Sequence, residues 1–159
     1  MALDGITLHW LGRELQKNLT GGWVRKIYQP RQELVTINVW NGENYTLLIS
    51  CDSDFRIQLT ELDLENPPRP PDFTMLLRKH LSGGKITRIT QRGLDRVIKI
   101  EVTQKSNSED EDAEMVRKDL YVELMGRNSN LSLVQDDKIL GVLKEKKGER
   151  RSLTPGGTY

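Results

Sequence analysis

The chain carries one segment twice, with the two copies about 62 residues apart. The copies are Leu15–Gln29 and Leu77–Gln91. Each contains the end of a predicted helix, a polar residue, two glycines and an alternating strand that ends in glutamine. A glycine pair after an apolar helical residue is typical of a helix that ends in left-handed backbone. The repeat therefore predicts two related halves, with a positive φ at one or both glycines of Gly21–Gly22 and of Gly83–Gly84.

The two copies differ in the turn that follows the repeated strand. The first turn is Pro30–Glu33, whereas the second is Arg92–Arg96 and is one residue longer before the next strand. In a duplicated scaffold, a turn that is altered in one copy is the first place to look for a function that the other copy lacks. Both glycine pairs are already explained by helix termination, so we expect them to be structural.

Hydrophobic periodicity predicts one helix at the start of each half. The first helix has leucines at positions 8, 11, 15 and 19, and Asp4 or Thr7 is expected to cap its start. Asp72 is expected to cap the second helix. The apolar face of the second helix is formed by Phe73, Leu76, Leu77 and Leu81.

Alternation of apolar and polar residues predicts strands in both halves, and Asn41-Gly42 is a hairpin turn signal. The expected strands are Trp23–Gln29, Leu34–Trp40, Tyr45–Ser50, Phe55–Thr60, Lys85–Gln91, Arg96–Thr103, Leu120–Met125, Leu131–Val134 and Ile139–Leu143. Ser106–Glu114 is acidic without apolar residues, and we expect a mobile hairpin tip there.

These elements predict an α+β fold in which two pseudo-repeated halves bury their apolar faces against each other as an antiparallel β-sandwich with two helices. Residues 1–65 form the expected first half and 73–143 the second, joined by a proline-rich connector at 66–72. Residues 144–159 form a basic tail that is expected to lead into further domains.

Composition narrows the class of protein. Lys and Arg number 24 against 23 Asp and Glu, so the overall charge favours no partner. Cys51 is the single cysteine, which excludes an internal disulfide, suits a reducing compartment and favours a small core residue over a nucleophile. With two histidines, no zinc or Cys-His site is expected. The chain has no evident signal peptide or membrane span, so we expect a soluble cytoplasmic protein without a cofactor.

Charge is unevenly distributed along the chain. Between Arg78 and Lys99 there are seven Lys and Arg against one acidic residue, whereas residues 52–65 hold five acidic residues and one Arg. This predicts one basic region, although a charge run is more often a solvated face. His80 is expected to be an ordinary packed or surface histidine. The aromatic residues expected in the core or in strands, and not as stacking platforms, are Trp10, Trp23, Tyr28 and Trp40.

Asp95 and Arg96 are the candidate site residues, because they lie in the altered turn and within the basic stretch. Arg offers a planar fork of donors for phosphates or base edges, and a neighbouring carboxylate can orient that fork or accept from a ribose hydroxyl. A turn Asp next to a solvated Arg is also ordinary. On the residues alone, this pair supports a hypothesis of anionic-ligand recognition.

Five motifs in the same order resemble the N-terminal domain of the NFACT family, which includes bacterial RqcH, fibronectin-binding protein A and eukaryotic NEMF. The motifs are Met1–Gly5, Gly21–Pro30, Met75–Leu81, Gly93–Arg96 and Glu123–Asn130. The resemblance covers essentially the whole chain. It implies a fold similar to the N-terminal β-sandwich of formamidopyrimidine-DNA glycosylases.

The resemblance also implies a role in ribosome-associated quality control. Family members bind large ribosomal subunits obstructed by peptidyl-tRNA and recruit charged tRNA, in bacteria alanyl-tRNA, for tail synthesis without mRNA. The family's Asp-Arg pair, here Asp95 and Arg96, is implied in tRNA recruitment together with an acidic residue that matches Asp4. Possible supporting residues are Arg78, Lys79, Arg92, Arg127, Asn128, Ser129 and Asn130. Asn128 stands where the family usually has His.

Two other functions stay open at this point. The first is a surface adhesin that binds fibronectin, as the older family name suggests; the missing export signal and the free Cys51 count against it. The second is a glycosylase-like nucleic-acid enzyme. Glycosylases of that fold use an N-terminal proline followed by glutamate, whereas this chain has Ala2 and Leu3. We therefore expect a tRNA-binding and rRNA-binding module that is not an enzyme.

Overall fold

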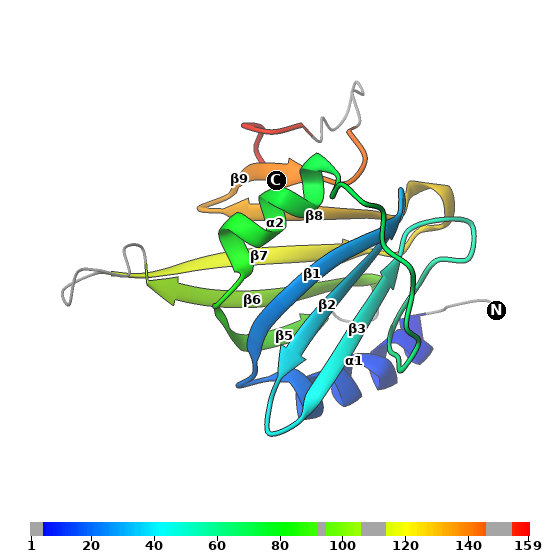
Figure 1. Ribbon diagram of the computed structural model, residues 1–159. Helices are drawn as coiled ribbons and strands as arrows, with labels where there is room; N and C mark the ends of the chain where they lie inside the picture. The colour runs from blue at the N-terminus through cyan, green and yellow to red at the C-terminus, as the bar shows by residue number, and fades with distance from the viewer. Residues whose placement is uncertain (1–4, 92–94, 106–113, 146–153) are drawn as a thin grey trace.

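The computed structural model describes residues 5–91, 95–105, 114–145 and 154–159 (Figure 1). Within these ranges the chain forms two α-helices, nine β-strands and one short 3-10 helix. The elements are α1 (Gly5–Leu19), β1 (Trp23–Arg31), β2 (Leu34–Trp40), β3 (Asn44–Ser50), β4 (Arg56–Leu59), α2 (Asp72–Leu81), β5 (Lys85–Gln91), β6 (Val97–Lys105), β7 (Met115–Glu123), η1 (Gly126–Asn128), β8 (Asn130–Gln135) and β9 (Lys138–Val142).

In the described residues, the strands form one antiparallel sheet in the order β4-β3-β2-β1-β5-β6-β7-β8-β9. The expected α+β class, antiparallel pairing and two helices are confirmed. The expectation of a sandwich is corrected in one respect, because β1 and β5 join the two halves into a continuous sheet. In Figure 1, β1, β2 and β3 run obliquely across the strands of the second half.

The repeated glycine segments make the junction between the halves. Gly21 N donates to Ile86 O at 2.7 Å, and the equivalent Gly83 N donates to Val24 O at 2.8 Å. The reciprocal bonds, from Ile86 N to Gly22 O and from Val24 N to Gly84 O, are both 2.8 Å long. The junction therefore has approximate twofold symmetry, which relates residues about 62 positions apart.

The glycines in this junction are structural, as predicted. Gly21 has a φ of 90° and Gly83 a φ of 81°, in the left-handed region that favours glycine. The second glycine of each pair is required by space. A Cβ on Gly22 would lie 2.6 Å from Val39 Cγ1, and a Cβ on Gly84 would lie 2.5 Å from Val102 Cγ1.

Each helix packs against the first strand of the other half. From α1, the Gln16 side-chain amide donates to Ile89 O in β5. At the equivalent positions, Arg78 Nε of α2 donates to Ile27 O in β1 at 2.8 Å. Leucines of both helices then enter a buried cluster that also contains residues of the sheet from both halves, among them Val35 and Leu120. The halves are therefore interlocked.

The helix starts differ from the prediction. Thr7 lies inside α1 and so is not its cap, and Asp4 lies outside the described residues. Asp72 is the first residue of α2, and the preceding Pro71 provides no side-chain cap.

Cys51 is fully buried in the core, as expected. Residues 106–113 of the acidic segment are also outside the described ranges.

In the described ranges, neither helix has the length and apolar content needed to cross a membrane.

The prediction that the tryptophans belong to the core or to strands holds for Trp23 and Trp40, and it is wrong for Trp10. Trp10 on α1 is 65% exposed, Trp23 is 47% exposed and Trp40 is 39% exposed. Trp23 and Trp40 are strand residues, as expected, and they form a directly opposed pair on β1 and β2. Lys85 Nζ lies 5.8 Å from the centroid of the Trp23 ring. These rings contribute to the surface of the molecule.

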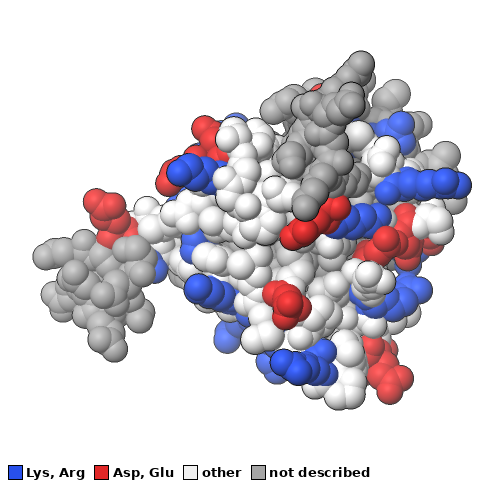
Figure 2. Space-filling view, turned by 90° about the horizontal axis from the view of Figure 1, so that it is seen from above, with Lys and Arg blue, Asp and Glu red and all other residues white. Residues whose placement is uncertain are grey.

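The prediction of a single basic region is also wrong, because the residues between Arg78 and Lys99 lie in separate places on the fold. Arg78 lies over the Tyr28 ring, at 5.4 Å from the centroid, whereas Arg88 lines a hollow beside α1. Lys99 makes an ion pair with Glu101 at 3.2 Å. Figure 2 shows Lys and Arg interspersed with Asp and Glu on the face seen from above.

Candidate functional site

Asp95 and Arg96 lie between β5 and β6, and both are exposed. Two hydrogen bonds fix the backbone beneath their side chains. Gln91 Nε2, at the end of β5, donates to Asp95 O at 2.6 Å. Leu124 N donates to Arg96 O at 2.9 Å. Because both side chains are exposed, the alternative in which Asp95 and Arg96 are buried partners is excluded.

The turn after β1 has the same backbone contacts. Gln29 Nε2 donates to Gln32 O at 2.8 Å, and Cys51 N donates to Glu33 O at 2.8 Å. These bonds match those at Asp95 and Arg96, so Gln32 and Glu33 are the equivalent residues of the first half. The last two residues of each turn therefore share their backbone contacts and differ in their side chains.

A hollow of about 610 Å³ opens beside Asp95 and Arg96. Its other walls include Phe55, from the segment before β4, and Met125 and Gly126, which follow β7. Met125 is 42% exposed. Sequence reasoning placed Phe55 and Met125 in strands and missed them as site residues, because only the fold brings the segment before β4 next to the turn after β5. The hollow thus combines a charged pair with apolar surface.

Residues 126–130 form the neighbouring turn, and they divide into structural and exposed residues. Ser129 Oγ accepts from Met125 N at 2.9 Å, and the buried Asn130 side chain accepts from Lys144 N and donates to Lys144 O, each at 2.9 Å. Arg127 and Asn128 are exposed. Of the four supporting candidates in this turn, Ser129 and Asn130 hold the backbone, and Arg127 and Asn128 present side chains.

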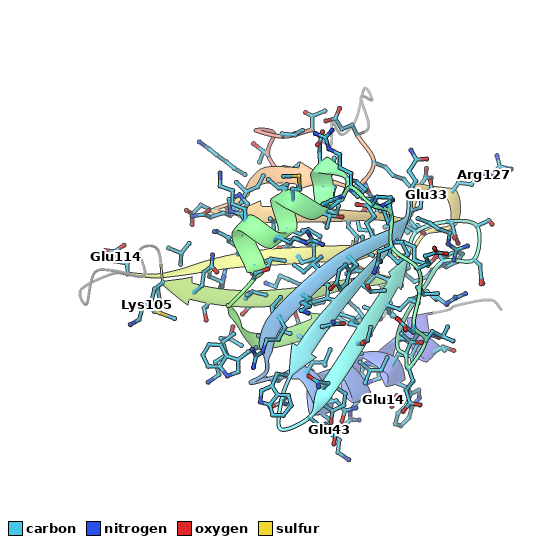
Figure 3. The ribbon with its side chains drawn as sticks, viewed as in Figure 1. Glu14, Glu33, Glu43, Lys105, Glu114 and Arg127 are labelled. Carbon is cyan, nitrogen blue, oxygen red and sulfur yellow. The ribbon has the colours of Figure 1, made fainter. Side chains whose placement is uncertain are left out.

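Lys144 ties the first turn to this region. Its Nζ donates to Cys51 O at 2.6 Å, lies 3.3 Å from a Glu33 carboxylate oxygen, and donates to Arg127 O at 3.5 Å. Glu33 and Arg127 lie at one end of the sheet, with Lys105 and Glu114 at the opposite end (Figure 3). The turn after β1 and the turn at residues 126–130 therefore lie at the same end of the molecule.

Two other supporting candidates, Arg78 and Lys79, lie on α2. The Arg78 side chain is engaged by β1 through Ile27 O and the Tyr28 ring. Lys79 is exposed. The pKa of the neighbouring His80 is lowered below its ordinary value, mainly by burial and also by the positive charges of Lys118 and Lys79. The structure thus gives Arg78 a structural contact. Asp4 and Arg92 lie outside the described residues.

The family described as NFACT N-terminal and middle domains matches residues 4–159. The chain belongs to the NFACT family. The Rqc2 homolog RqcH of Streptococcus suis is 39% identical to it over 166 residues, covering 100% of this chain and 29% of that protein. The Rqc2 homolog RqcH of Bacillus subtilis is also 39% identical, with 28% of its length covered. The chain therefore spans less than a third of these NFACT relatives.

Two solved structures share the fold. The N-terminal domain of fibronectin-binding protein PavA from Streptococcus pneumoniae superposes with a TM-score of 0.91 at 36% identity, covering 99% of this chain and 61% of that one. The N-terminal part of the fibronectin/fibrinogen-binding protein from Streptococcus suis gives a TM-score of 0.92 at 38% identity, covering 99% and 60%.

Proposed function

We propose that this chain is the tRNA-binding part of a ribosome-associated quality-control factor. In this proposal, the whole protein binds obstructed large ribosomal subunits that carry peptidyl-tRNA. It recruits charged tRNA, alanyl-tRNA in particular, for C-terminal tailing without mRNA. The relatives named as RqcH support the quality-control role. The observation that carries the tRNA site is the exposed Asp95-Arg96 pair beside a hollow.

The chemistry of the pair suits a folded RNA. The Arg96 guanidinium can donate two parallel hydrogen bonds to a phosphate or to a base edge. The Asp95 carboxylate only accepts, so it selects a donor such as a ribose 2′-hydroxyl or a base amine. Phe55 and Met125 supply apolar surface on which an unstacked base can rest. Arg127 adds a cation at the edge of the site.

The module is proposed to bind and position its ligand without catalysing a reaction. The ribosome supplies the bond-forming chemistry, and the working compartment is the cytoplasm. Asp4 is proposed as a further tRNA contact on the strength of the family pattern. The likeness to the N-terminal domain of formamidopyrimidine-DNA glycosylases stays a prediction.

A second candidate function is fibronectin binding. It is favoured by the names of two structural neighbours, which describe fibronectin-binding proteins. Nothing in the geometry of the Asp95-Arg96 hollow is specific to such a partner. Recovery of fibronectin without recovery of tRNA by the purified protein would favour this candidate.

The test of the tRNA site is a pull-down with the full-length protein. Asp95→Ala with Arg96→Ala should abolish recovery of tRNA and tail synthesis, while ribosome association persists through other regions. The matched control is Arg31→Ala with Gln32→Ala, which removes exposed side chains from the equivalent turn. Equal recovery of tRNA by the site variant and the control would contradict the proposal.

A further inference from the structure

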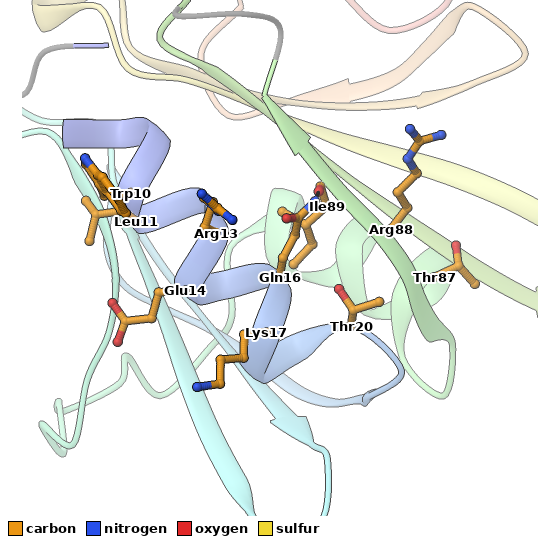
Figure 4. Close-up of a pocket in the computed structure, with 10 residues that line it drawn as sticks. All are labelled: Trp10, Leu11, Arg13, Glu14, Gln16, Lys17, Thr20, Thr87, Arg88 and Ile89. Atoms are coloured by element: carbon orange, nitrogen blue, oxygen red, sulfur yellow. Dashed lines mark hydrogen bonds between the residues drawn. The ribbon is translucent and has the colours of Figure 1, made fainter. Parts of the chain in front are cut away.

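A second surface lies between α1 and β5, away from the Asp95-Arg96 turn. Figure 4 shows the hollow there, with Arg13 carried by α1 and Arg88 by β5. Its volume is about 850 Å³, against about 610 Å³ for the hollow beside Asp95 and Arg96. Among the described lining residues, the cations Arg13, Lys17 and Arg88 outnumber the single anion, Glu14. The groove therefore favours a negatively charged occupant.

The symmetry of the fold explains why this groove is open. In the equivalent place between α2 and β1, the long Arg78 side chain lies over the Tyr28 ring. The equivalent residues are shorter: Gln16, which lines the groove, and Thr90, which lines the smaller hollow next to it. The same backbone arrangement thus has its helix–strand space occupied by Arg78 in one half and open as a groove in the other.

Trp10 gives the groove an aromatic wall. This side chain is 65% exposed, and the Arg13 guanidinium lies 6.0 Å from the centroid of its ring. An exposed indole beside cations is the arrangement on which nucleic-acid bases stack while their phosphates pair with Lys and Arg. An acidic side chain of a peptide would use the cations alone and leave the indole face unexplained.

The groove leads toward the Asp95-Arg96 turn. A smaller hollow of about 170 Å³ shares Arg13, Gln16 and Ile89 with the groove and continues along β5 to Gln91. Gln91 Nε2 in turn donates to Asp95 O. The two surfaces are therefore connected along one strand.

We propose that the α1–β5 groove binds a single-stranded segment of RNA, with a base on Trp10 and its phosphates at Arg13, Lys17 and Arg88. The proposal rests on the proposed function for the identity of the RNA, because a tRNA held at Asp95-Arg96 offers single-stranded loops and a single-stranded end. The groove adds a second contact, in which an exposed indole and three cations take the place of the Asp-Arg pair.

The direct test uses fluorescein-labelled oligouridine and the intact chain, with binding followed by fluorescence anisotropy. Lys17→Glu with Arg88→Glu should weaken binding by about tenfold or more, because both phosphate contacts become repulsive. Trp10→Ala should weaken it by about tenfold, the usual scale for one lost base stack. The control is Arg25→Glu with Lys26→Glu, the same change of charge on exposed residues of the equivalent strand β1, which should retain near wild-type affinity.

Several results would overturn the proposal. These are an absence of oligouridine binding by the wild-type chain, an equal loss in the charge-reversed variant and its control, or no effect of Trp10→Ala. Polyglutamate that binds more tightly than oligouridine, independently of Trp10, would assign the groove to an acidic peptide instead. Melting temperatures of all variants confirm that they remain folded.

A parallel measurement with tRNA separates this proposal from the proposed function. If Asp95→Ala with Arg96→Ala loses tRNA but keeps oligouridine, both proposals stand as separate surfaces. If the groove variants keep full affinity for both RNAs, the groove proposal fails and the turn is unaffected. If the wild-type chain binds oligouridine in the groove but no tRNA, the proposed function fails instead.

Discussion

The last two residues of the turn after β1 and of the turn after β5 make equivalent backbone contacts and have different side-chain environments. Glu33 in the first turn pairs with Lys144, which also bonds Cys51 O and so ties the turn to the rest of the fold. Asp95 and Arg96 at the equivalent positions are exposed beside a hollow. The contrast indicates that the first turn stabilises the domain, whereas the second presents the pair that we propose to bind tRNA.

The same contrast appears along the helices. The long Arg78 side chain occupies the space between α2 and β1. The shorter Gln16 side chain leaves a groove between α1 and β5. In both comparisons, the shared features are hydrogen bonds to backbone oxygens, and the differences are in the side chains that line the surface. Removing a shared feature should therefore destabilise the domain to the same extent in either half. Removing a divergent feature should change either stability or tRNA affinity, but not both.

The largest effect is expected at the shared junction. Gly22→Val and Gly84→Val should each cost about 3 kcal/mol of unfolding free energy, because the added atoms overlap Val39 and Val102. Denaturant unfolding of the two single variants measures this. A much smaller loss in one of them would show that the halves are not equivalent at the junction.

Lys144→Ala should give the next largest effect. The change removes the pairing of Glu33 and the donor to Cys51 O, and Lys144 is only 19% exposed. We expect a loss of about 1–2 kcal/mol in unfolding free energy, with tRNA affinity little changed. Lys144→Met, which keeps most of the apolar stem, serves as the control for lost packing. A large loss of tRNA affinity at unchanged stability would reverse the assigned roles of the two turns.

Asp95→Ala with Arg96→Ala should change stability by less than about 0.5 kcal/mol, because both side chains are exposed at a turn. Thermal melting alongside the Lys144→Ala variant makes the comparison direct. Destabilisation equal to that of Lys144→Ala would mean that both turns are structural.

The smallest effect concerns His80. Because its folded-state pKa is lowered, the unfolded chain binds the proton more readily, so stability contributed by neutral His80 is lost as the pH falls below about 6.5. His80→Gln should therefore flatten the decline in melting temperature between about pH 7 and pH 5. An unchanged decline would show that His80 does not contribute to this pH dependence.

The elements that depend on local pattern were predictable from the sequence. The bounds of β2 and β5 match the prediction, and so do the positive φ values of Gly21 and Gly83. These follow from alternation and from helix termination within a short stretch of chain.

Features that depend on distant pairing were not predictable. The bulges in β1 and β5 shift the alternation, so that Arg25 and Lys26, or Thr87 and Arg88, are exposed in succession. Phe55 became a site residue only because the segment before β4 folds against the turn after β5. The altered turn pointed to Asp95 and Arg96, the family resemblance implied their role in tRNA recruitment, and the fold placed both at the surface.

The most direct test of the central claim exchanges the side chains of the divergent turn for those of its equivalent. Asp95→Gln with Arg96→Glu gives the second turn the residues that the first has at Gln32 and Glu33. The dissociation constant for tRNA and the melting temperature are measured on the same preparation. The account predicts that tRNA affinity is lost while the melting temperature stays within a few degrees of wild type. Retained affinity at wild-type stability would contradict it.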